Sequence, residues 1–147
     1  MLLAAAIMSN ATYAQKKPAD KVPATVASAF KARFPNTTKV TWEKESEKEF
    51  EATFKLNGEK TSINFDNSGK WLETETELKI SALPAAVQST ISKEFAGFKA
   101  DEASKVESAK DGICYEAELE KGKEEWEVLF SADGKVLSKT KEEEKGK

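Results

Sequence analysis

The sequence predicts an α+β fold made of two tandem copies of one unit, in which a helix packs on a three- or four-stranded antiparallel sheet. Apolar residues first recur every three to four positions in each half of the chain, which indicates a helix, and then alternate with polar residues, which indicates strands. The same order of patterns and turn glycines follows both Val22-Pro23 and Leu83-Pro84. An internal repeat of this kind predicts one supersecondary unit used twice.

Each copy is expected to begin with a short amphipathic helix, because its apolar residues recur every four positions and so form one stripe on one face. These positions are Val26, Phe30 and Phe34 in the first copy and Val87, Ile91 and Phe95 in the second. Pro23 and Pro84 suit the first helical position, where the missing N–H would have no intrahelical partner. Pro35 and Gly97 are expected to end the two helices.

After each helix the period changes to two, as expected for half-buried antiparallel strands. Asn57-Gly58 and Lys121-Gly122 supply tight turns between strands. Asp66-Asn67-Ser68-Gly69 is interpreted as a β-turn, because the other ligand positions of a calcium loop are missing. The expected strands cover 39–44, 50–56, 63–65 and 70–77 in the first copy and 103–109, 115–120, 126–130 and 135–141 in the second.

The chain is expected to be an exported protein. An uncharged apolar run followed by small residues at 12 and 14 predicts a secretory signal peptide over 1–14, cleaved after Ala14, and an ordinary buried N-terminal helix is the alternative. The run is shorter than the ~20 residues of a membrane span. The expected organisation is then a linker over 15–21, repeats over 22–78 and 79–141, and a charged tail over 142–147, in a periplasmic or secreted protein.

Composition argues against several classes of function. The formal net charge is −3 with no basic stripe, so nucleic acid is not an expected partner. The chain has no histidine, which removes the Ser-His and Cys-His nucleophile pairs, and Cys114 is its only cysteine. No nucleotide-binding motif is present. We therefore expect no catalytic residues, no metal-ligand motif and no cofactor. Cys114 is expected to be a half-buried structural residue on the strand face opposite Tyr115, and intermolecular pairing or a reactive thiol is the alternative.

Acidic residues are plentiful in the first copy, where Glu43, Glu45, Glu47, Glu49 and Glu51 alternate along two adjoining segments. They alternate with apolar residues that point inward, so they are expected to lie in water. Capture of a cation is the alternative.

The aromatic residues point to a surface for binding another protein. Trp42 and Trp126 match the strand parity of core residues, whereas Trp71 lies on the open sheet face if its neighbour Leu72 points inward. Exposed tryptophans anchor interfaces. The candidate partner-binding residues are Trp71, Thr53, Asn64 and Glu73.

The motifs resemble those of the PepSY-like family of exported bacterial proteins, which is described as similar in fold to the β-lactamase-inhibitor protein. The resemblance covers 22–140 and is clearest in FEATF at 50–54 and FDNSGKWL at 65–72, whereas Ser131 and Val136 depart from the first copy's Asp66 and Trp71. It implies a helix-plus-sheet unit, an envelope location and a role in binding or inhibiting another protein.

The sequence is compatible with two functions. The first is a non-enzymatic, exported protein-binding module that inhibits or regulates an envelope hydrolase or protease. The alternative is an envelope protein that binds a small ligand or a divalent cation through the glutamate-rich strands. The partner of the first would be another envelope or secreted protein, and the oligomeric state is left open.

Overall fold

The computed structural model of the protein describes residues 17–18 and 21–142, with side chains from residue 21 onward. The chain divides into two compact units, with the boundary between Glu75 and Thr76. Each unit combines one α-helix with antiparallel strands, so the expected α+β class is confirmed. The expected signal peptide over 1–14 and residues 143–147 of the expected tail lie outside the described residues.

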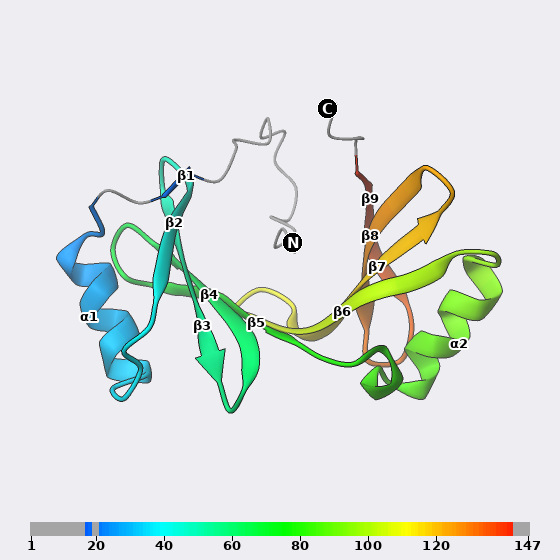
Figure 1. The fold of residues 1–147 in the computed structure, drawn as a ribbon, viewed down its shortest axis with the longest axis horizontal. Coiled ribbons are helices and arrows are strands. Elements are labelled where there is room, and N and C mark those ends of the chain that lie inside the picture. Colours follow the sequence, from blue (N-terminus) through cyan, green and yellow to red (C-terminus); the bar gives the residue numbers. More distant parts are fainter. Residues whose placement is uncertain (1–16, 19–20, 143–147) are drawn as a thin grey trace. The chain divides into compact units, whose positions relative to one another are not determined.

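In the first unit the strands lie side by side in chain order, and the helix lies against one face of them (Figure 1). The elements are β1 (Lys17–Pro18), α1 (Ala24–Arg33), β2 (Thr41–Ser46), β3 (Glu49–Leu56), β4 (Glu59–Asp66) and β5 (Trp71–Glu77). The pairs β1-β2, β2-β3 and β3-β4 are antiparallel.

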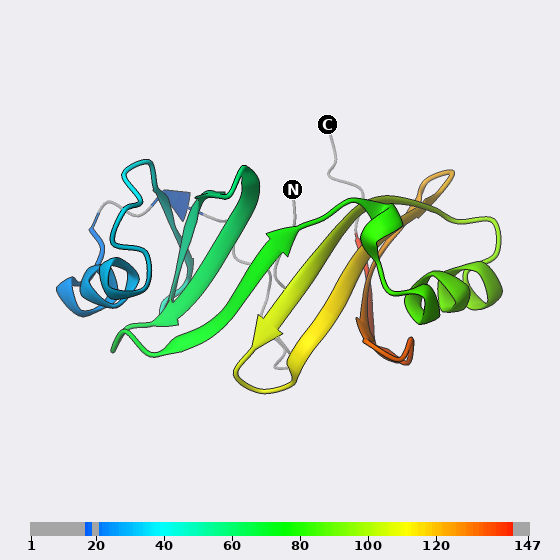
Figure 2. The same cartoon turned by 90° about the horizontal axis from the view of Figure 1, so that it is seen from below.

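In the second unit the strands again follow chain order, with the helix on one side of the sheet (Figure 2). Its elements are a 3-10 turn η1 (Ile80–Ala82), α2 (Ala85–Glu94), β6 (Lys99–Ser108), β7 (Gly112–Lys121), β8 (Glu124–Ser131) and β9 (Val136–Lys141). All three strand pairs are antiparallel.

The apolar stripe of α1 forms the core of the first unit with one face of the sheet. Phe30 packs edge-on against Phe54, with ring centroids 5.2 Å apart, and against Trp42 at 5.4 Å. The fully or nearly fully buried members are Val26, Phe30, Phe50, Ala52, Phe54, Ile63 and Phe65. Trp42 completes this cluster, as its strand parity predicts.

The core of the second unit is also built from helix and strand residues, with Leu83 added from the segment between η1 and α2. Its buried members are Leu83, Val87, Ala103, Ala117, Leu119, Val128 and Phe130, and Trp126 packs against them as expected. A smaller buried cluster of Val106, Cys114 and Leu129 lies apart from it. Cys114 is 2% exposed, and the half-buried Tyr115 packs on the main core instead, as strand alternation predicts.

A β-turn seats against the first turn of the helix in each unit. Gly69 has a φ of +85°, and a Cβ added to it would lie 2.7 Å from the carbonyl oxygen of Thr25. The Thr25 hydroxyl donates a hydrogen bond of 3.0 Å to the Asn67 carbonyl. In the second unit a Cβ added to Gly134 would likewise lie 2.5 Å from the carbonyl oxygen of Ala86. The glycines of these turns are therefore needed for close approach to the helix.

The side chain of Asp66 organises the first of these turns. One of its oxygens accepts hydrogen bonds from the Ser68 amide and hydroxyl and from the Lys70 amide. The Ser68 hydroxyl is the main reason why the pKa of Asp66 lies below its ordinary value. The segment is thus a β-turn, as interpreted from the sequence, with the carboxylate occupied by its own loop.

The helices begin one residue later than expected. Pro23 and Pro84 have extended backbone, with ψ of 141° and 142°, and precede the first helical residue rather than occupying it. The carbonyl of each proline accepts the first helical hydrogen bond, from Ala27 and Gln88 respectively. Both positions suit proline because neither needs its N–H.

Candidate functional site

A row of polar side chains crosses the first unit on the sheet face that does not carry α1. Strand register places Glu43 of β2 opposite Glu51 of β3, and Glu51 opposite Asn64 of β4. Side chains directly opposite one another in neighbouring strands have their Cβ atoms about 4.5–5.5 Å apart. Glu51 and Asn64 are 3% and 6% exposed, so this row is buried although it faces away from the helix.

Glu45 joins the row through an irregularity in β2. The register between β2 and β3 shifts between Lys44 and Ser46, which leaves Glu45 as the extra residue of a bulge. Bulges bend a strand and redirect a side chain, and they are frequent next to functional sites. One carboxylate oxygen from each of Glu43, Glu45 and Glu51 lies within 4.8 Å of the other two.

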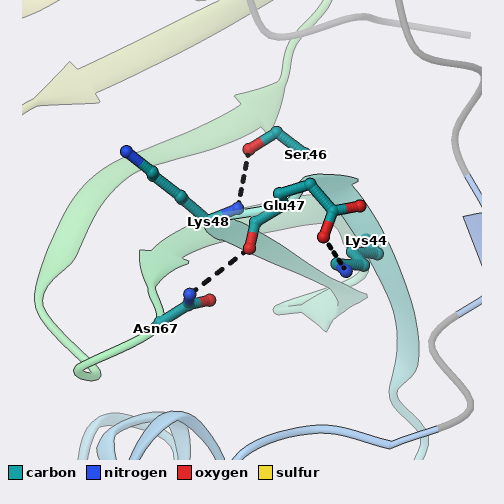
Figure 3. A network of polar contacts seen from close by, with 5 residues as sticks. All are labelled: Lys44, Ser46, Glu47, Lys48 and Asn67. Atoms are coloured by element: carbon teal, nitrogen blue, oxygen red, sulfur yellow. Dashed lines mark hydrogen bonds and ion pairs between the residues drawn. The ribbon is translucent and has the colours of Figure 1, made fainter.

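A network of polar contacts fixes the end of the hairpin that carries this bulge (Figure 3). The Asn67 side-chain amide donates to the Glu47 carbonyl at 3.3 Å, and the Ser46 hydroxyl accepts from the Lys48 amide at 3.2 Å. Lys44 forms an ion pair of 3.0 Å with Glu47. The turn that precedes β5 thereby holds the β2-β3 hairpin in place.

Glu73 and Glu75 of β5 add to the same face. The pKa of Glu73 is raised from 4.5 to about 7. Burial is the largest cause, and the negative charges of Glu75, Glu49, Glu51 and Glu45 contribute the rest. Glu75 is itself 5% exposed. We call Glu43, Glu45, Glu49, Glu51, Asn64, Glu73 and Glu75 the acidic face of the first unit.

The burial of this face corrects an expectation from the sequence. The glutamates of β2 and β3 were expected to lie in water, but Glu51 is buried and Glu43 and Glu45 are half-buried. Only Glu47, in the turn, is almost fully exposed, at 93% of its side chain. Strand alternation shows that a residue points away from the helix, but it does not show what else surrounds it.

The structure brings together three of the four residues proposed as a partner-binding surface. Asn64 and Glu73 belong to the acidic face, and the Thr53 hydroxyl donates to a Glu51 carboxylate oxygen at 3.3 Å. Trp71 instead packs against the core on the helix side. The Arg33 guanidinium lies 4.9 Å from its ring centre, and its indole N–H donates to the Thr74 hydroxyl at 2.9 Å.

Sequence reasoning missed the contribution of Glu75 and of the bulge at Glu45. The alternating threonines and glutamates at 73–77 were a signal for Glu75, because they repeat the pattern of the earlier glutamates. Asn64 also indicated that this face carries polar side chains. It lies between the core residues Ile63 and Phe65, so its amide must point to the opposite face of the strand. Bulges leave no comparable pattern in the sequence.

The second unit carries a related but different arrangement on its own helix-free face. Glu102, Glu118 and Glu127 form a row across β6, β7 and β8. Burial, a hydrogen bond with Glu125 and the Glu125 charge raise the pKa of Glu118 to about 7. In the neighbouring row Glu116 stands opposite Leu129, whereas Glu51 stands opposite Asn64. At this position the second unit therefore has an apolar side chain, Leu129, where the first unit has the amide of Asn64.

The fold is that of a small α+β protein in which each unit has a helix on one sheet face and acidic side chains on the other. The chain belongs to the PepSY-like family, since the family model described as "Putative beta-lactamase-inhibitor-like, PepSY-like" matches residues 10–59 and 48–138. The resemblance seen in the sequence is thus confirmed. No curated protein matches the chain.

Several solved structures from Bacteroides share the fold. A DUF2874 family protein from Bacteroides ovatus has a TM-score of 0.74 at 23% identity, covering 84% of this chain and 89% of its own. A "putative periplasmic" protein from Bacteroides eggerthii has a TM-score of 0.75 at 22% identity, covering 82% and 89%. A BLIP-like protein from Bacteroides fragilis has a TM-score of 0.69 at 26% identity, covering 81% and 86%. Neither helix of the described residues has the length and apolar character needed to cross a membrane.

Proposed function

We propose that the protein is a non-enzymatic, exported protein-binding module of the cell envelope, and that the acidic face of its first unit binds a positively charged segment of another protein. The observation that carries the proposal is the crowding of carboxylates on this one face, where burial and the neighbouring carboxylates together raise the pKa of Glu73 to about 7. A lysine or arginine side chain placed there would offset the repulsion between the carboxylates.

The comparisons support this class of function without naming a partner. The family description includes "beta-lactamase-inhibitor-like", and one solved relative is called BLIP-like. The absence of histidine from the sequence is consistent with a role without catalysis. The export signal over 1–14 and the interpretation of 22–78 and 79–141 as two repeats remain part of the proposal. Inhibition of an envelope hydrolase or protease is the specific activity we propose to test.

The test is affinity capture followed by measurement with the purified partner. The immobilised protein is exposed to an envelope extract, and the binding of each retained protein is measured for wild type, Glu73→Gln and the control Glu59→Gln. Glu59 is exposed at the start of β4 and its replacement removes the same charge. We expect Glu73→Gln alone to weaken binding, and we expect binding to weaken with salt.

The pH dependence gives a second signature of the same surface. Because the pKa of Glu73 is raised to about 7, this side chain gains its charge between pH 6 and pH 8, and a cationic partner should bind more tightly at pH 8. If the retained protein is a hydrolase, its activity is then measured with and without this protein. Binding that is equal in both variants and insensitive to salt and pH would refute the acidic face as the docking surface.

A further inference from the structure

The acidic face also holds a set of oxygen atoms with the geometry of a cation site. Glu43, Glu45 and Glu51 each offer one carboxylate oxygen, and these three oxygens lie within 4.8 Å of one another. Acidic clusters are common on protein surfaces, so this convergence alone does not indicate an ion. The neighbouring strand supplies the second observation.

Asn64 is the register partner of Glu51 on β4 and lies on the same face. Its side chain is buried, and its Oδ1 atom accepts no hydrogen bond. A buried amide oxygen without a partner is destabilising, because it has lost its hydrogen bonds to water. A bound cation would satisfy this oxygen, because amide oxygens are regular ligands of hard cations.

We propose that Glu43, Glu45, Glu51 and Asn64 form a calcium-binding site. All four offer oxygen ligands, which calcium prefers, and none offers the nitrogen or sulfur that zinc favours. Three carboxylates and one amide can supply up to seven oxygens when the carboxylates bind through both atoms, within the six to eight that calcium takes.

The ligand set favours calcium over magnesium. Calcium binds oxygen at about 2.3–2.6 Å in flexible geometry, and three oxygens that all lie within 4.8 Å of one another can contact one such ion. Magnesium binds at about 2.0–2.1 Å, requires nearly octahedral geometry and usually keeps several waters rather than being enclosed by protein ligands. The half-exposed carboxylates of Glu43 and Glu45 leave a route from solvent.

The second unit provides a natural comparison for the role of Asn64. Leu129 occupies the position opposite Glu116 that Asn64 occupies opposite Glu51. Leucine is therefore already accommodated at this place in a sheet of the same chain, which makes Asn64→Leu a conservative test. That substitution removes the ligand oxygen without changing the net charge, and it removes a buried polar atom rather than creating one.

The experiment is calorimetric titration of the purified full chain with calcium chloride and, separately, magnesium chloride, after treatment with a chelator. We expect calcium to bind with a Kd of about 10⁻⁴ to 10⁻³ M, the range of extracellular calcium modules. Asn64→Leu should weaken binding about tenfold or more, and Asn64→Asp should tighten it because it adds ligand charge. Glu51→Gln should weaken binding, whereas Glu59→Gln, with the same loss of charge, should not.

Each alternative result contradicts the site. Calcium binding that is unchanged in Asn64→Leu would show that the Asn64 oxygen is not a ligand. The ion would then be attracted by the negative charge of the carboxylates, which this variant keeps. Magnesium binding as tight as calcium binding would contradict the assignment of the ion. The absence of heat and of any change in melting temperature at about 10 mM calcium, ten times the expected upper limit, would exclude the site. Melting curves of the variants serve as the control that each variant folds. The titration involves no partner protein, so its outcome does not depend on the proposed docking function.

Discussion

Replacing Glu73 by glutamine should change how the stability of the protein depends on pH. Burial and four neighbouring carboxylates raise the pKa of this side chain from 4.5 to about 7 in the folded protein. Between these values the unfolded chain has lost a proton that the folded protein keeps. Stability contributed by the neutral side chain is therefore full below pH 4.5 and is lost as the pH rises through 7.

The magnitude follows from the size of the pKa shift. A shift of about 2.5 pK units corresponds to at most about 3.4 kcal/mol, because one unit is worth about 1.36 kcal/mol. Water still reaches part of this half-buried side chain, so we expect about 2 kcal/mol. Glutamine has a similar shape and does not ionise, so Glu73→Gln should be more stable than wild type by about this amount at pH 8 and equal to it near pH 4.5.

Urea denaturation at pH 5 and pH 8, in the presence of a chelator, measures both proteins. With a slope of about 2 kcal/mol per M, the midpoint of Glu73→Gln should rise by about 1 M relative to wild type at pH 8. Glu118 also has a raised pKa, so wild type retains a second source of pH dependence and only the difference between the proteins is diagnostic. A constant difference between pH 5 and pH 8 would refute the reasoning, and Glu59→Gln controls for the loss of a surface charge.

Three further predictions concern packing. Gly69→Ala should cost about 1–3 kcal/mol more than Gly58→Ala, because both glycines have positive φ but only Gly69 contacts the helix; equal losses in urea denaturation would contradict this contact. Trp71→Ala should lower stability by about 2 kcal/mol, less than the 3–5 kcal/mol of a fully buried aromatic residue, and an unchanged melting temperature would place it outside the core. Cys114 should react with a thiol reagent far more slowly in native protein than in urea, and equal rates would show that it is accessible.

The class of fold could be predicted from the sequence because its periodicities are strong. Each apolar pattern reflects burial of one face of an element against one neighbour, and the spacing of apolar residues shows this directly. The helix and the sheet of the first unit bury Val26, Phe30, Phe50, Phe54 and Phe65 in this way. Strand β6 was expected to begin at 103 but begins at Lys99. A register shift between Ala100 and Glu102 interrupts the alternation there, so the pattern begins late.

The candidate site was less predictable because it depends on neighbours across the sheet. Sequence alternation identified Asn64 and Thr53 as facing away from the helix, but it assigned the nearby glutamates to water. Parity alone would also place Trp71 and Glu73 on one face, yet Trp71 packs on the core and Glu73 interacts with the carboxylates. Only the positions of adjacent strands show which of these side chains are crowded together.

The contrast between the two kinds of glycine turn determines where foreign sequence can enter this protein. The turn at Gly69 is pressed against a helix carbonyl, so an inserted peptide would separate the helix from the sheet. At Gly58 an added Cβ would meet nothing within 4 Å, although the backbone conformation is similar. An epitope tag or a labelling sequence should therefore be tolerated between Asn57 and Gly58, as insertions generally are at exposed loop tips. That position provides an internal attachment point for immobilising the protein while both chain ends stay as they are.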